Sequence, residues 1–165
     1  MSKPAARITD SVAHPLPPVL TGGPGSPNVF IGKLPAWRGM PLASSAGLLA
    51  AKTTADTQVK AVEAASKAAQ GTPALPAAIA AEESTKATVA ATMSTNIRAS
   101  AMGADIHMCT TPLPVPPHGP GVVINGSKTV LINGLPACRM GDNILEALGP
   151  MNVITKGEVT VLIGG

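Results

Sequence analysis

The sequence predicts a small, mainly β fold in which three imperfect repeats share one narrow core and an alanine-rich helical hairpin is inserted between two of them. Three observations support this prediction: a segment that recurs along the chain, a composition rich in glycine and proline but nearly free of aromatics, and one long block of contrasting composition. The 165 residues suit one domain with an appended element.

The recurring segment is a strand, a turn and the start of a second strand. Residues 25–38 read GSPNVFIGKLPAWR, residues 126–139 read GSKTVLINGLPACR, and residues 157–165 read GEVTVLIGG. The copies place Gly32-Lys33, Asn133-Gly134 and Gly164-Gly165 at the turn. Because Asn-Gly between runs of β-forming residues is a strong hairpin signal, each copy is predicted to be a short β-unit.

Three such units cannot each bury a face alone, so we expect them to surround a common axis with pseudo-threefold symmetry. Only small residues and tight turns fit as the radius shrinks toward that axis, which predicts a tapered β-cone. The chain has 17 Gly and 17 Pro, and its only aromatic residues are Phe30 and Trp37. A core this thin normally needs a metal, a disulfide or a partner to stabilise it.

A second pattern locates an insertion. Each unit opens with an Arg followed three residues later by an Asp, as in Arg7-Ile8-Thr9-Asp10 and Arg139-Met140-Gly141-Asp142. Arg38-Gly39-Met40 lacks this Asp, but Met102-Gly103-Ala104-Asp105 supplies it about sixty residues later. We therefore expect residues 41–101 to be an insertion in a β-cone formed by residues 1–40 and 102–165.

The insertion is predicted to be two helices. It holds 20 Ala but only two Gly, and it breaks at Gly71-Thr72-Pro73-Ala74-Leu75-Pro76, which gives helices over about 43–70 and 75–100. Apolar residues follow helical spacing on both: Leu48, Ala51, Ala55, Val59, Val62, Ala65 and Ala69 on the first, and Ile79, Val89, Met93 and Ile97 on the second. A solvated arm packed on itself or on the body and a docking arm for cargo or a partner remain alternatives, whereas weak amphipathicity argues against a membrane-active hairpin.

Charge and targeting signals exclude several function classes. The net charge is +3, but the basic residues are scattered and lack interleaved aromatics, which argues against nucleic-acid binding. No segment is apolar enough to span a bilayer, so stable membrane insertion is not expected. Residues 1–10 show no signal-peptide pattern, so we expect a cytoplasmic protein before any export, in a compartment where thiols favour metal over disulfides.

The histidines and one cysteine form a candidate metal site. The chain has three histidines, His14, His107 and His118, all outside the insertion. His14 follows Asp10 by four residues and Cys109 follows Asp105 by four, so these two occupy equivalent positions. His107 and Cys109 are two apart, which places them on one face of a strand. Three imidazoles and a thiolate are a tetrahedral ligand set that zinc favours, and four protein ligands make the site structural.

Two other residues are weaker candidates. Glu146 is the third-unit equivalent of His14 and Cys109, and a carboxylate can ligate zinc, so it is a possible substitute ligand. Cys138 stands where the first unit has Trp37, which favours a packing role. A zinc hydrolase would need an open metal position and a general base, and no hydrolase or phosphate-binding motif occurs, so the sequence does not favour an enzyme.

These segments resemble a known family. The opening Pro4-Ala5-Ala6-Arg7, the segments NVFIGKLPAWR and TVLINGLPACRMGD, the terminal TVLIGG and the Asp-x-His-x-Cys motif at 105–109 are similar to PAAR-repeat proteins. The resemblance covers nearly all of the chain outside the insertion. It implies a β-cone with one structural zinc near the vertex, held by His14, His107, Cys109 and His118.

The resemblance also implies a role. Such a protein caps and sharpens the trimeric VgrG spike of a type VI secretion system, is exported with it, and is monomeric when free. It can carry an effector or its chaperone. The alternative is a cargo-binding adaptor or effector of a related contractile injection system that acts through the helical insertion.

Overall fold

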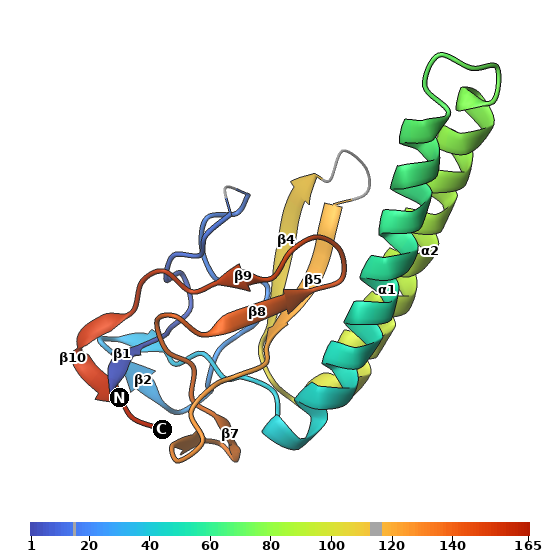
Figure 1. Cartoon of the computed structure of the whole chain (residues 1–165). Coiled ribbons are helices and arrows are strands. Elements are labelled where there is room, and N and C mark those ends of the chain that lie inside the picture. The colour runs from blue at the N-terminus through green and yellow to red at the C-terminus, as the bar shows by residue number, and fades with distance from the viewer. Residues whose placement is uncertain (15, 113–116) are drawn as a thin grey trace.

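The computed structural model describes residues 1–14, 16–112 and 117–165. Its helices are α1 (Leu42–Ala68) and α2 (Leu75–Ala101). Its strands are β1 (Lys3–Ala5), β2 (Phe30–Ile31), β3 (Leu34–Pro35), β4 (Ile106–Pro112), β5 (Pro117–Val123), β6 (Leu131–Ile132), β7 (Leu135–Pro136), β8 (Asn143–Glu146), β9 (Asn152–Val153) and β10 (Glu158–Ile163). The helical hairpin stands beside a body of short strands (Figure 1).

The secondary-structure content is mixed, with 34% helix and 28% strand, so the mainly β prediction was too narrow. The reason is that most of the repeat strands are only two or three residues long, whereas each helix has 27 residues. The largest sheet has four antiparallel strands in the order β4-β5-β8-β9, and the other sheets are two-stranded.

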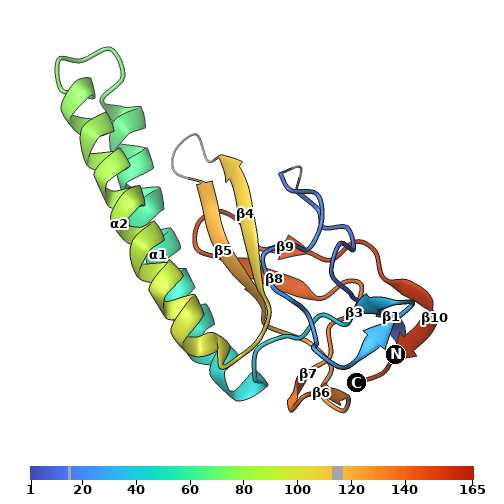
Figure 2. The same ribbon diagram turned by 180° about the vertical axis from the view of Figure 1, so that it is seen from behind.

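Two of the predicted repeat hairpins have the expected turn geometry. Strands β2 and β3 pair across Gly32-Lys33, and β6 and β7 pair across Asn133-Gly134. All four turn residues have positive φ, between 54° and 78°, as a type I′ turn requires. The third copy, β10, pairs instead with β1 at the N-terminus, so both termini lie beside the hairpins at one end of the molecule (Figures 1 and 2).

A closed ring of backbone hydrogen bonds joins the three repeats. The Ala6 N–H donates to the Cys138 carbonyl, the Cys138 N–H to the Trp37 carbonyl, and the Trp37 N–H to the Ala6 carbonyl, at 2.9 to 3.1 Å. These residues hold the same place in the Pro-Ala-x-Arg segments of the three repeats, and each is at most 1% exposed. The ring therefore marks an approximate threefold axis through the body.

Repeat-equivalent apolar residues pack around this axis. One core cluster contains three alanines and three isoleucines from corresponding positions: Ala5, Ala36, Ala137, Ile31, Ile132 and Ile163. Trp37 and Cys138 belong to a second core cluster. Neither cysteine is in a disulfide, and Cys138 has the packing role that its repeat position predicted.

The helical hairpin is packed on the body. Helices α1 and α2 begin and end within two residues of the predicted limits, and Pro76 lies in the first turn of α2, where a missing N–H costs little. Helix α2 contacts β5. A shared core cluster joins the two parts, with Leu48, Ala55, Val89, Met93 and Ile97 from the helices and Val122, Ile124, Leu135, Leu145 and Leu148 from the body. Ile79, predicted on the apolar stripe, is instead 43% exposed.

Candidate metal centre

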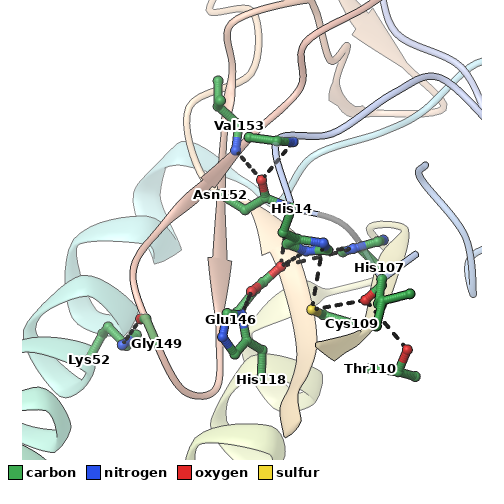
Figure 3. Close-up of polar contacts among 12 residues, drawn as sticks. His14, Lys52, His107, Cys109, Thr110, His118, Glu146, Gly149, Asn152 and Val153 are labelled. Carbon is green, nitrogen blue, oxygen red and sulfur yellow. Dashed lines mark hydrogen bonds and ion pairs between the residues drawn. The ribbon is translucent and has the colours of Figure 1, made fainter. Parts of the chain in front are cut away.

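Three of the four predicted ligands converge on one side of the body. His107 and Cys109 lie on β4, where alternation directs both side chains inward, at 0% and 1% exposure. His14 comes from the loop that follows β1. Its Nε2 lies 3.4 Å from Nε2 of His107, and its Nδ1 lies 3.8 Å from Sγ of Cys109 (Figure 3). The rings of His14 and His107 stack at 5.3 Å between centroids.

The fourth member of the cluster is Glu146, at the end of β8. Donor atoms of His14, His107, Cys109 and Glu146 all lie within 4.8 Å of one another, so this group could hold a metal ion. Oε1 of Glu146 lies 2.7 Å from Nε2 of His14 and 3.9 Å from Nε2 of His107. The Glu146 side chain is fully buried. The residue that the sequence offered only as a substitute is therefore a member of the cluster.

His118 lies beside this group rather than within it. It is at the start of β5, and its Nδ1 is 2.7 Å from Oε2 of Glu146, the oxygen that faces away from His14. Its ring stands edge-on to that of His14, with 6.0 Å between the ring centroids. The structure thus places His118 one contact further out than His14, His107 and Cys109 (Figure 3).

One residue that the sequence analysis missed ties the cluster together. The Nδ2 of Asn152, on β9, donates to Oε1 of Glu146 at 3.4 Å, and its Oδ1 accepts from the Ala13 N–H at 3.0 Å. Asn152 thereby links the carboxylate to the residue preceding His14. A single asparagine carries no metal-ligand signal in sequence, and only the pairing of β8 with β9 brings it here.

The surroundings of His107 favour its neutral imidazole. Burial lowers the pKa of His107 to about 4. The nearby Glu146 carboxylate acts in the opposite direction and raises this pKa, whereas His14 lowers it further. His107 is therefore unprotonated at pH 7 and has a lone pair to offer. Cys138 differs, because burial first and then the carboxylates of Asp142 and Asp105 raise the pKa of its thiol well above the ordinary value. Cys138 therefore stays protonated as a thiol, beside the approximate threefold axis.

The donor set fits a divalent metal. Imidazole nitrogen, thiolate sulfur and carboxylate oxygen are the ligand types that zinc takes in proteins, and four protein donors leave no open position for substrate. Such a closed centre contributes folding free energy, since the ligands are gathered only in the native state.

Among the described residues no helix is long and apolar enough to cross a membrane.

Comparison with protein families agrees with this architecture. The model of the PAAR motif matches twice, over residues 85–145 and 113–165. Both matches include His118, and the first also includes His107 and Cys109, whereas residues 1–40 with the first repeat lie outside them. Neither the curated proteins nor the solved structures contain a match. Together the two motif matches cover residues 85–165 and support a PAAR-repeat protein, of the family that forms the spike tips of type VI secretion systems.

Proposed function

We propose that this protein caps and sharpens the trimeric VgrG spike of a type VI secretion system, without catalysis. The observation that carries the proposal is a set of three apolar side chains, Phe30, Leu131 and Leu162, which we call the basal triad. They occupy the same position in the three repeats, directly before the buried residues Ile31, Ile132 and Ile163.

The basal triad is exposed to nearly the same extent at each position, at 58%, 60% and 61%. Single exposed apolar residues are ordinary, but three at equivalent positions around an approximate threefold axis match the symmetry of a trimeric partner. They lie on β2, β6 and β10, at the end of the molecule that holds both termini (Figures 1 and 2). A spike trimer presents three equivalent surfaces to such an end.

The metal centre suits a tip that has to withstand force. Strand β4 ends and β5 begins at the end of the molecule away from the termini (Figure 2), and Cys109 and His118 lie toward that end. We propose that one zinc ion per chain staples this narrow end of a β-cone. Family resemblance predicts His14, His107, Cys109 and His118 as ligands. The zinc would supply rigidity and folding free energy where few apolar residues are available.

The test of spike capping is binding of the zinc-loaded full chain to a purified VgrG trimer from the same genome. Substituting Asp at Phe30, Leu131 and Leu162 is expected to weaken binding at least tenfold, because each Asp adds an unpaired charge to an apolar contact. Ile79→Asp on α2, which adds the same charge at an apolar residue that is 43% exposed, is the control. Unchanged binding in all three triad variants, with Ile79→Asp equally unchanged, would contradict capping through this end.

A second proposed role, carriage of an effector or its chaperone, rests on the helical hairpin. The hairpin extends beyond the strands of the body, and its connecting turn is far from them (Figures 1 and 2). Deleting residues 41–101 would also uncover the shared core cluster, so point variants at exposed Leu49 and Ile79 are the cleaner test. Loss of cargo binding in these variants, with VgrG binding retained, would support the role. On this account the free protein is a cytoplasmic monomer that the injection machine exports.

A further inference from the structure

We infer that Glu146 is a direct metal ligand, together with His14, His107 and Cys109, and that His118 is a positioning residue acting through the Glu146 carboxylate. This inference rests on the proposed zinc centre and changes its ligand set, because it replaces one imidazole with a carboxylate. Three observations carry it: the repeat positions, the convergence of donor atoms, and the partners of the two carboxylate oxygens.

The repeat positions place Glu146 beside the other ligands by symmetry. His14, Cys109 and Glu146 each follow the Asp of their repeat by four residues. The backbone ring through Ala6, Trp37 and Cys138 shows that the three repeats surround one axis. Residues at equivalent positions therefore point toward a common region, and the three side chains meet there.

The donor atoms converge without His118. Atoms of His14, His107, Cys109 and Glu146 all lie within 4.8 Å of one another, as donors to one ion must. The His14–His107 separation of 3.4 Å and the His107–Glu146 separation of 3.9 Å are near the distances expected between ligands around one zinc, given bonds of about 2.0 to 2.2 Å. The His14–Glu146 separation of 2.7 Å is a hydrogen bond, which coordination to the ion would replace. His118 stands outside this group and contacts Oε2, the oxygen not directed at His14.

The charges also balance with Glu146 as a ligand. The Glu146 side chain is 0% exposed, and the polar side chains reported to contact it are those of His14, His107, His118 and Asn152, with no lysine or arginine among these described partners. A buried carboxylate requires a cation or a full set of donors. A divalent ion with one thiolate and one carboxylate is neutral.

His118 then has a defined task. A hydrogen bond from its Nδ1 to Oε2 fixes the orientation of the carboxylate and leaves Oε1 directed at the cluster, as outer partners of metal ligands commonly do. Losing such a partner typically weakens metal binding about 10- to 100-fold, whereas losing the ligand itself also changes the coordination.

Zinc K-edge X-ray absorption on the full zinc-loaded chain counts the ligands directly. We expect one sulfur, two imidazoles and one carboxylate oxygen. Three imidazoles would overturn the inference and leave the proposed zinc tip intact, because that is the ligand set of the family resemblance. Absence of bound zinc in the purified wild-type protein would overturn both.

Variants titrated with Co²⁺ and Zn²⁺ give an independent readout. Glu146→Gln is expected to weaken binding at least 100-fold and to shift the visible d–d bands of bound Co²⁺. His118→Ala should weaken binding about tenfold with the bands in place, and His118→Asn, whose amide can donate to Oε2, should recover most of the loss. Glu158→Gln, a carboxylate at the other end of the body, is the control. Wild-type affinity in Glu146→Gln, or shifted bands in His118→Ala alone, would overturn the assignment.

Discussion

Arg38 and Asp105, 67 positions apart, make the same two-pronged ion pair that Arg7 makes with Asp10 and Arg139 with Asp142 three positions apart. In each pair the arginine Nε and one terminal nitrogen reach the two carboxylate oxygens at 2.9 to 3.2 Å, and the arginine backbone N–H donates to the same carboxylate. The helical hairpin lies between Arg38 and Asp105 in the chain, yet this repeat junction forms the same ion pair as the two junctions that have no insertion.

This pair predicts a large loss of stability in Asp105→Asn. Asp105 is 1% exposed and Arg38 is 9% exposed, so the substitution leaves a buried guanidinium without its counter-charge. Breaking a buried pair from one side costs about 3 kcal/mol or more of unfolding free energy. Urea unfolding followed by the fluorescence of Trp37, the only tryptophan, measures it.

The matched control for Asp105→Asn is Glu63→Gln in the hairpin. The Glu63 side chain is 43% exposed, and its partner Lys86 keeps Glu82 as a second carboxylate. The control is expected to change the unfolding free energy by less than about 1 kcal/mol. Equal losses in the two variants would show that the junction pair has no special role.

Ile97→Ala is expected to destabilise the body as well as the hairpin. Ile97 is fully buried in the cluster shared by α2 and the sheet. Removing three of its carbons should cost about 2 to 4 kcal/mol. Helical circular dichroism and Trp37 fluorescence should report one coincident transition, shifted to lower urea. Ile79→Ala, at an exposed position, should change little, and separate transitions for the two probes would indicate an independently folding hairpin.

Stability should fall with acid in a range set by His107. Its pKa is about 4 in the folded protein and about 6.5 when unfolded, so between these values only the unfolded chain binds the proton. The stability is fully present above pH 6.5 and is lost progressively toward pH 4, by up to roughly 3 kcal/mol. Chelator-treated protein measured across this range isolates the effect from metal release.

His107→Gln tests the source of that pH dependence, because it removes the titrating group. Between pH 6.5 and 4 the unfolding free energy is expected to fall less steeply with pH in the variant. The difference in slope corresponds to the uptake of up to one proton fewer on unfolding. In the zinc-loaded wild type the fall should be steeper, since protons compete with metal for the ligands. A flat profile down to pH 4 in both forms would contradict a neutral, ligating His107.

Metal removal should distinguish the two cysteines. A chelator is expected to make Cys109 reactive toward a thiol reagent, because its sulfur is then no longer held by the ion. Cys138 should stay unreactive in the folded protein, since its side chain is 0% exposed and burial raises the pKa of its thiol. Mass spectrometry of the modified peptides identifies the site. Modification of Cys138 before Cys109 would contradict this placement of the two residues.

Local chemistry explains which parts of the fold were predictable. The Asn133-Gly134 turn and its counterpart at Gly32-Lys33 have positive φ values that few residues adopt readily, so the sequence marks those hairpins. The helices were visible from alanine content and from the break at Gly71. The docking of α2 on β5 was not predictable, because helical spacing identifies an apolar stripe but not the surface that it packs against. Ile79 follows the stripe but lies exposed.

The candidate site was only partly predictable for a related reason. The repeats show that His14, Cys109 and Glu146 occupy equivalent positions. The sequence alone, however, distinguishes candidate ligands only by residue type, and on that basis the His118 imidazole was preferred to the Glu146 carboxylate. The relative depth of Glu146 and His118 depends on how β5 pairs with β8 across the sheet, through Gly121 opposite Glu146. Nothing in the sequence indicates that Asn152 contacts the site, because only the pairing of β9 with β8 brings it there.

The central claim, a PAAR-repeat tip stapled by a metal, is tested most directly by elemental mass spectrometry of the full chain purified without added metal. Thermal unfolding of the same samples and of Cys109→Ser completes the measurement. The account predicts about one zinc per chain in the wild type, and loss of both the zinc and a large part of the thermal stability in the variant. A wild-type protein free of metal, with Cys109→Ser equally stable, would contradict it.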